Sequence, residues 1–120
     1  MGMFDEVYCY YKLRPVRLTA NNLISFAPGT RFQTKDLYNI LDSYILSVDG
    51  KLLYKEFNWI DKVEPISANY KDMFFDGIFN FYTVYKNEEN SYMIDFYARF
   101  KEGLVQHINH EVTSLIKKHI

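Results

Sequence analysis

Six polar and aromatic side chains in the second half of the sequence have types that could form a site: Asn80, Tyr82, Asp95, Tyr97, Arg99 and His107. In an enzyme, such a set would use the histidine as a base, the aspartate to orient it and the arginine to bind an anion. No motif places a serine or cysteine nucleophile beside them, and no phosphate-binding loop is present. Cross-strand pairing on a solvated sheet is the simpler explanation. We therefore predict binding residues and no catalytic ones.

A metal site is the second chemistry to consider. His107, His110 and Glu111 have the spacing H-x-x-H-E, which differs from the H-E-x-x-H motif of zinc enzymes and from its inverse. We expect His107 on a strand and His110 at a helix start, so the two rings need not converge. Because metal sites need three or four converging ligands, we predict no metal and no cofactor.

An expected three-strand antiparallel meander positions the candidate residues. Its first two strands, Ile78–Tyr85 and Tyr92–Phe100, are rich in aromatic and β-branched residues, and a polar loop, Asn87–Asn90, separates them. A three-residue turn, Lys101–Gly103, places glycine where a positive φ is needed, and Leu104–Ile108 returns as the third strand.

The loops also predict the register of the meander. If Lys86 faces Ser91, one face is almost wholly apolar, with the pairs Tyr85–Tyr92, Thr83–Ile94, Phe81–Phe96 and Phe79–Ala98. If Phe100 faces Leu104, the third strand adds Leu104, Gln106 and Ile108 to that face. The opposite face then carries all six candidate residues.

The earlier part of the chain predicts more strands. Phe4–Leu13 alternates as a strand, and Leu23–Phe26 is a short one. Tyr44–Val48 and Lys51–Trp59 flank Asp49-Gly50, which is typical of a two-residue hairpin turn.

Two segments predict helices. After Ile108, Asn109 is a suitable N-cap, and Val112, Leu115, Ile116 and His119 form an apolar stripe. Near Asp36, Thr34 would cap a short helix with Leu37, Ile40, Leu41 and Tyr44 at helical spacing, although a bent strand with a bulge fits almost as well.

The expected fold is therefore α+β: mainly antiparallel, with six to eight strands in a meander and hairpins and a C-terminal amphipathic helix. We expect that helix to cover the apolar face of the meander and leave the candidate face open. The alternative is that Arg14–Thr30 covers the candidate face.

Composition and charge limit the function classes. The 120 residues, with 11 Tyr and 10 Phe, are expected to form a single domain, 1–120. A net charge of −1 without a basic stripe argues against nucleic-acid binding. The single cysteine, Cys9, allows no intrachain disulfide, and no run of eighteen apolar residues is present. These features favour the cytoplasm and give no sign of a membrane partner.

The stretch F-Q-T-K-D-L, Phe32 to Leu37, is conspicuous but has a structural explanation. Thr34 and Asp36 would turn the backbone, while Phe32 and Leu37 enter the core. Cys9 is likewise expected to be a small core residue, because its tyrosine neighbours supply no cation that would lower its pKa.

Four stretches resemble a group of small uncharacterised proteins of bacteria and their phages. They are M-G-M-F-D at Met1–Asp5, F-Q-T-K-D-L, Y-x-L-x-x-D-G-K-L at Tyr44–Leu52 and F-x-x-G-x-V-x-x-I at Phe100–Ile108. This chain departs from the group in the long Arg14–Gly29 insertion and in its expected C-terminal helix. The resemblance carries no functional residue; it implies a phage or mobile-element accessory protein that acts in the cytoplasm of a bacterial host.

We therefore expect a non-enzymatic interaction protein that binds a host protein and inhibits it, with a defence protein as one such target. The alternative is a protein that binds or sequesters a small nucleotide-like ligand; an enzyme and a virion component rank third and fourth. A homodimer is a further prediction, because Phe4–Leu13 and Leu52–Trp59 would make edge strands with few charges.

Overall fold

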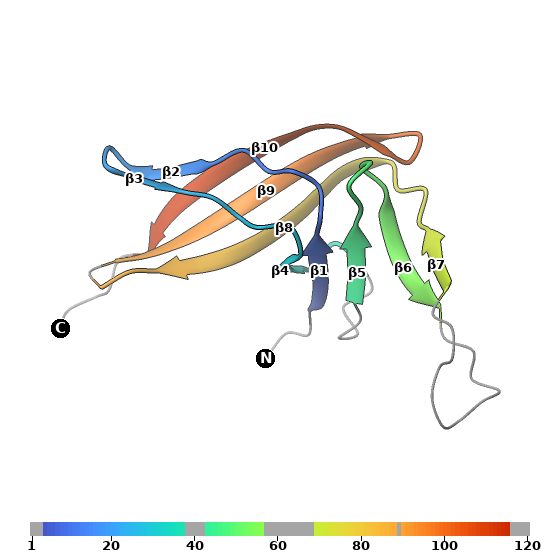
Figure 1. Ribbon diagram of the computed structural model, residues 1–120, viewed down its shortest axis with the longest axis horizontal. Coiled ribbons are helices and arrows are strands. Elements are labelled where there is room, and N and C mark those ends of the chain that lie inside the picture. Colours follow the sequence, from blue (N-terminus) through green and yellow to red (C-terminus); the bar gives the residue numbers. More distant parts are fainter. Residues whose placement is uncertain (1–3, 38–42, 57–68, 89, 116–120) are drawn as a thin grey trace, which may run out of the picture.

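The chain folds into ten strands in a computed structural model that describes residues 4–37, 43–56, 69–88 and 90–115. The strands are β1 (Asp5–Cys9), β2 (Val16–Thr19), β3 (Asn22–Ile24), β4 (Thr30–Thr34), β5 (Ser43–Leu46), β6 (Leu52–Glu56), β7 (Asn69–Asp72), β8 (Gly77–Lys86), β9 (Ser91–Lys101) and β10 (Leu104–Leu115). Eight of them form one sheet in the order β10-β9-β8-β4-β1-β5-β6-β7, and β2 pairs with β3. Figure 1 shows the long strands β8, β9 and β10 running across the molecule, with β1, β5, β6 and β7 beneath them.

The predicted α+β fold with a C-terminal helix is wrong, because the chain continues after Ile108 as strand β10. Asn109, the expected helix cap, lies opposite Tyr97 in the β9–β10 ladder. The apolar spacing fitted a helix, but Ile108 and Val112 also alternate with polar neighbours, and pairing with β9 decides between the two. Residues 116–120 lie outside the described part. No helix in the described residues is long and apolar enough to cross a membrane.

The short helix predicted near Asp36 is not formed at either of its ends. Thr34 ends β4 and Tyr44 lies in β5, while Ile40 and Leu41 lie outside the described residues. The Thr34 hydroxyl nevertheless turns the backbone locally, since it accepts the N–H of Asp36 at 3.2 Å. A strand followed by a side-chain-stabilised turn replaces the helix.

The sheet is mixed, and its interior contains the segments that we predicted as edges. β1 pairs antiparallel with β4 and parallel with β5, and β6 lies between β5 and β7. Strands β1 (Asp5–Cys9) and β6 (Leu52–Glu56) therefore have a neighbouring strand on each side and are not the sheet edges that we expected. The homodimer stays a prediction without that support. The sheet described here ends in β7 and β10.

The β8–β9 register is confirmed. Lys86 faces Ser91, and all four predicted pairs are formed: Tyr85–Tyr92, Thr83–Ile94, Phe81–Phe96 and Phe79–Ala98. Alternation of apolar residues on two long strands joined by a short loop determined this register, because a slip of one residue would expose the phenylalanines.

The turn into β10 differs from the prediction. Lys101 pairs with Leu104, so the loop contains only Glu102 and Gly103, with φ values of 53° and 79°. Two consecutive positive φ values are typical of a type I′ turn, whose twist matches that of the flanking strands.

As a result, the start of β10 is shifted by one residue. Val105 instead of Leu104 lies opposite Phe100, and Leu104 is exposed. A bulge between Val105 and His107 then adds a second residue to the shift, so Ile108 lies opposite Ala98 and not opposite Phe96. Ile108 nevertheless lies on the apolar side as predicted, whereas Gln106, predicted on that side, lies in the bulge.

The β5–β6 hairpin exists, but its loop is one residue longer than predicted. Ser47 donates its N–H to the carbonyl of Lys51 at 2.8 Å, which leaves Val48, Asp49 and Gly50 in the loop. Gly50 has a φ of 87°, as the third residue of such a loop requires.

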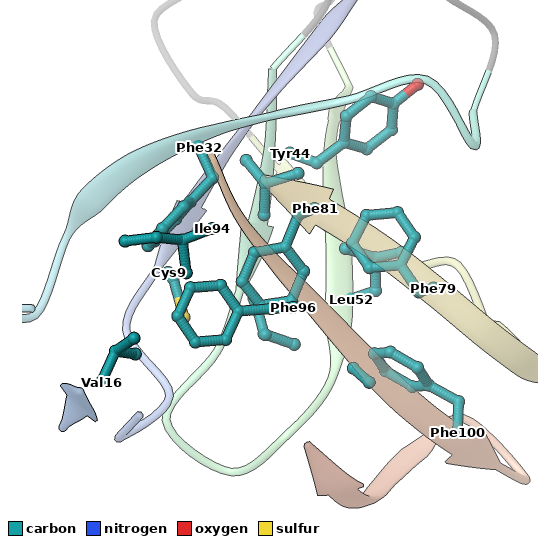
Figure 2. Packing of buried hydrophobic residues seen from close by; sticks show 13 residues of the cluster. Cys9, Val16, Phe32, Tyr44, Leu52, Phe79, Phe81, Ile94, Phe96 and Phe100 are labelled. Atoms are coloured by element: carbon teal, nitrogen blue, oxygen red, sulfur yellow. The ribbon is translucent and has the colours of Figure 1, made fainter. Parts of the chain in front are cut away.

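The core lies on the apolar face of the meander, as Figure 2 shows. Its fully buried large side chains include Phe32, Phe79, Phe81, Phe96 and Ile94. The segment with β2 and β3 covers this face in place of a helix: Val16 is fully buried, and the Phe26 ring lies 5.6 Å from that of Phe96. Arg14–Thr30 therefore packs on the phenylalanine side and not, as in our alternative, on the candidate face.

The structural interpretation of F-Q-T-K-D-L is confirmed. Phe32 is 1% exposed and Leu37 packs against the core. Thr34 and Asp36 bind backbone groups: the Thr34 hydroxyl donates to the carbonyl of Asn80, and a carboxylate oxygen of Asp36 accepts the Asn80 N–H.

Candidate functional site

The six candidate residues lie on one surface, which we call the outer face: the side chains of β8, β9 and β10 that point away from the phenylalanine core. Across the three strands its central rows are Ile78–Arg99–His107, Asn80–Tyr97–Asn109 and Tyr82–Asp95–Glu111. The predicted register placed His107 opposite Tyr97, and the bulge in β10 places it opposite Arg99 instead. The structure thus brings the set together with one change of neighbour.

The outer face is accessible. Arg99 and His107 are exposed, while Asn80, Tyr82, Asp95 and Tyr97 are half-buried. These side chains are half-buried because neighbours on a sheet surface pack against one another. The segment with β2 and β3 lies on the opposite side of the sheet, so it does not cover these residues.

Asn80 and Asp95 have structural partners on the outer face. The Asn80 side-chain amide donates to Asp95 Oδ1 at 3.2 Å and to the carbonyl of Phe96 at 3.1 Å. The backbone N–H of Asn80 is bound by Asp36. These contacts fix both side chains across β8 and β9, as cross-strand pairing predicts.

Carboxylates dominate the electrostatics around the two tyrosines. Asp95 raises the pKa of Tyr97, with further contributions from desolvation, Glu111 and Asp36. Burial raises the pKa of Tyr82, and Asp95 adds to it. Both hydroxyls therefore remain protonated hydrogen-bond donors at neutral pH.

Sequence reasoning missed three residues of this surface. Asn109 and Glu111 were assigned to a helix; continuing the strand alternation past Ile108 would have put both on the outer face. Asp36 comes from a segment far away in the sequence, and no local pattern indicates its contact with Asn80.

The geometry does not assemble a catalytic histidine–aspartate pair. His107 lies opposite Arg99, which is four residues from Asp95 along β9. At about 3.3 Å per residue this separates the two positions by roughly 13 Å, far beyond hydrogen-bond reach. His110 lies on the other face, with its ring 6.1 Å from that of Phe96. Among the described residues, no three His, Cys, Asp or Glu side chains could together hold a metal ion.

Exposed apolar side chains border the tyrosines. Ile78 and Val84, on β8, are 52% and 46% exposed, and Leu115 of β10 is 39% exposed. The outer face therefore combines aromatic, apolar and charged groups, a composition that is typical of protein-binding surfaces.

Cys9 is the remaining group with reactive chemistry, and we expect it to be inert in the folded protein. It is 2% exposed, and burial raises the pKa of its thiol to about 12, although a hydrogen bond with the Tyr11 backbone acts in the opposite direction. Because the thiolate is the nucleophile, iodoacetamide at neutral pH should leave the native protein unlabelled and label it once urea unfolds it. Labelling of native protein at the rate of a free thiol, measured by mass spectrometry, would contradict this burial.

Comparisons with known proteins assign no family to this chain. No protein-family model, no curated protein and no solved structure matches it. The resemblance to small bacterial and phage proteins therefore stays a prediction, and function must be argued from the geometry described above.

Proposed function

We propose that this protein is a non-enzymatic interaction protein that binds a partner protein through its outer face. The observation that carries the proposal is the contrast between the two sides of the meander. One side is closed by β2, β3 and the aromatic core, whereas the other presents Tyr82 and Tyr97 beside the exposed side chains of Ile78 and Val84.

Tyrosine suits such a role because its rigid ring offers a large contact area and its hydroxyl donates a hydrogen bond. On the outer face both tyrosine side chains are flanked by neighbours across the sheet, so little conformational entropy is left to lose on binding. Arg99 adds a planar cation, the second residue type that recurs in binding hot spots.

The charges of the outer face suggest the chemistry of the partner. Positive groups gather near the β9–β10 turn, where Arg99 and Lys101 lie, and carboxylates gather at Asp95 and Glu111. A partner with a basic group opposite the carboxylates and an acidic group near the turn would be complementary. Such complementarity speeds association and selects among partners.

The proposed partner is a bacterial host protein, which binding would inhibit. A component of a defence system is one such target. This part of the proposal is supported by the sequence resemblance to phage and bacterial proteins and by the lack of an assembled catalytic pair among the described residues. It makes the protein a cytoplasmic accessory factor of a phage or mobile element.

Single substitutions on the outer face test the proposal. Tyr97→Ala and Arg99→Ala should each weaken partner binding by roughly thirty-fold if they are hot spots, which corresponds to about 2 kcal/mol. Neither should change the free energy of unfolding by more than about 1 kcal/mol, because Arg99 is exposed and Tyr97 is only half-buried. The partner is captured from bacterial lysate with the parent chain, and the affinity of each purified variant for it is then measured.

Matched controls are available outside the outer face. Tyr10, directly after β1, is 42% exposed, and Arg17 is exposed on β2. Tyr10→Ala and Arg17→Ala should leave the affinity within about two-fold, since surface changes away from an interface are nearly neutral. Equal loss in both pairs of variants, or full affinity of Tyr97→Ala and Arg99→Ala, would place the binding surface elsewhere.

A further inference from the structure

A cleft of about 270 Å³ lies on the other side of β10 from the outer face. Its wall is the extended segment Tyr11–Arg14, which leads from β1 to β2, and its opposite wall is Gln106–His110 of β10, with Phe96 beneath. Figure 1 shows this connection crossing β10 on its way to β2. Two segments about ninety residues apart in the sequence therefore form one concave surface.

Local structure explains why the wall presents charge to the cleft. Tyr11 and Leu13 are half-buried and pack against the core, while the alternate residues Lys12 and Arg14 are exposed. In an extended chain, successive side chains point to opposite sides, so both cations lie on the side away from the core. Pro15 and the fully buried Val16 hold the end of this segment in place.

The lining of the cleft is basic. Its charged side chains are Lys12 and Arg14, and it includes no aspartate or glutamate. Among the described residues, neither Lys12 nor Arg14 forms an ion pair with a carboxylate, unlike Arg31 with Glu6 and Lys51 with Asp49. Concave surfaces lined by unpaired charge of one sign concentrate ions of the opposite sign.

The edge of β10 adds neutral donors. Lys101 and Leu104 close the two-residue turn and therefore form a hydrogen-bonded pair, after which such pairs alternate along the ladder. Val105 follows this rule, since its N–H points away from β9 and donates to the carbonyl of Gly50 at 2.9 Å. With the bulge included, the same alternation directs the N–H groups of Ile108 and His110 away from β9, at the edge that lines the cleft.

We propose that this cleft is a binding site for a small anion that carries a phosphate group. Lys12 and Arg14 supply the charge, and the His110 side chain and the edge N–H groups supply hydrogen bonds. The volume lies just below the range of about 300–1,000 Å³ for small-molecule sites, which fits a free phosphate or a mononucleotide and not a polymer. Tyr11, which also lines the cleft and is half-buried, offers a nucleotide an aromatic surface that free phosphate does not use. This site does not depend on the protein-binding role of the outer face.

The test uses the full chain with three probes: inorganic phosphate, AMP and adenosine. We expect phosphate and AMP to bind saturably and adenosine not to bind. Binding is measured by calorimetry and by changes in the amide chemical shifts of Ile108 to His110. Tighter binding of AMP than of phosphate would indicate that the natural ligand is a nucleotide, and equal affinities would indicate that the site recognises the phosphate group alone. The double variant Lys12→Ala/Arg14→Ala should weaken binding by roughly ten-fold or more, because two charge-assisted contacts are lost.

The control variant Lys86→Ala/Lys101→Ala removes the same two charges at exposed positions of β8 and β9 outside the cleft. It should bind phosphate within about two-fold of the parent chain if the site is local, because neither side chain lines the cleft. Equal weakening in the two double variants would show nonspecific attraction and overturn the proposal, as would failure of phosphate and AMP to saturate at millimolar concentration. Because neither double variant alters a buried side chain, loss of binding will not reflect unfolding, and thermal denaturation of each variant verifies this.

Discussion

We expect the Phe96→Ala variant to lose about 3–5 kcal/mol of its free energy of unfolding. The side chain is 1% exposed, and its ring is at the centre of the aromatic core. Its ring centroid lies 5.2 Å from that of Phe81, 5.4 Å from Phe32 and 5.6 Å from Phe26. These three rings belong to β8, to β4 and to the segment after β3, so truncation leaves a cavity where three parts of the chain meet.

A loss of this size is a large share of the total stability, since domains of this kind unfold with about 5–15 kcal/mol. Urea denaturation followed by circular dichroism measures it. The matched variant is Val84→Ala on the outer face, where the side chain is 46% exposed, and it should cost less than about 1 kcal/mol. If Phe96→Ala does not remain folded, Phe96→Leu keeps most of the apolar volume and should show an intermediate loss. A loss below about 1 kcal/mol for Phe96→Ala would mean that these rings do not pack as described.

The same rings explain which part of the fold the sequence predicts. Phe79, Phe81, Ile94 and Phe96 alternate with polar residues on two strands that a short loop joins, so pairing and burial give one consistent register. The candidate residues on the opposite face follow from that register without further information. Five of the six consequently lie beside the predicted neighbours on β8 and β9, and only His107 changes its neighbour, through a bulge that no residue type indicated.

The errors arise where local pattern and long-range pairing compete. Ile108 and Val112 satisfy both a helical and a strand period, and β9 offers a free edge of eleven residues that a strand can pair with and a helix cannot. Local propensity differs by only a few tenths of a kcal/mol per residue, so a full ladder of hydrogen bonds outweighs it. The parallel β1–β5 pair has no local signal at all, because it joins segments separated by three other strands in the sequence.

The junction between the two halves of the sheet leads to the second large effect. β10, β9 and β8 form one half, and β4, β1, β5, β6 and β7 form the other. In the described residues, a single ladder pair, Gln33 with Tyr82, joins β4 to β8. Two side chains extend the connection: the Thr34 hydroxyl donates to the carbonyl of Asn80 at 2.7 Å, and Asp36 accepts the N–H of the same residue at 2.6 Å. Both backbone groups of Asn80 are thus bound by side chains in place of a continued ladder.

We expect Thr34→Val to lower the free energy of unfolding by about 1–3 kcal/mol. Thr34 is fully buried, and valine keeps its shape while it removes the hydroxyl, so the Asn80 carbonyl loses its partner in a site that water does not reach easily. The Asp36 N–H, which the same hydroxyl accepts at 3.2 Å, is also released. Thr83→Val is the matched control, because it makes the same exchange of hydroxyl for methyl at a half-buried position of β8 where no hydrogen bond of the hydroxyl is described. It should change the free energy of unfolding by about 0.5 kcal/mol or less.

Thr34 and Asp36 both bind the backbone of Asn80 at this junction, so their contributions to stability should be coupled. Thr34→Val and Asp36→Ala should be non-additive by about 0.5 kcal/mol or more, because both act on Asn80 and one hydroxyl binds both segments. Hydrogen exchange should accelerate at the amides of Asn80 and Tyr82 more than at those of β9, since opening the junction separates β4 from β8 and leaves the β8–β9 ladder intact. Uniform acceleration across β4, β8 and β9 would instead mean that the two halves of the sheet unfold only together. The single ladder pair and its two side-chain hydrogen bonds would then not be the weakest connection in the fold.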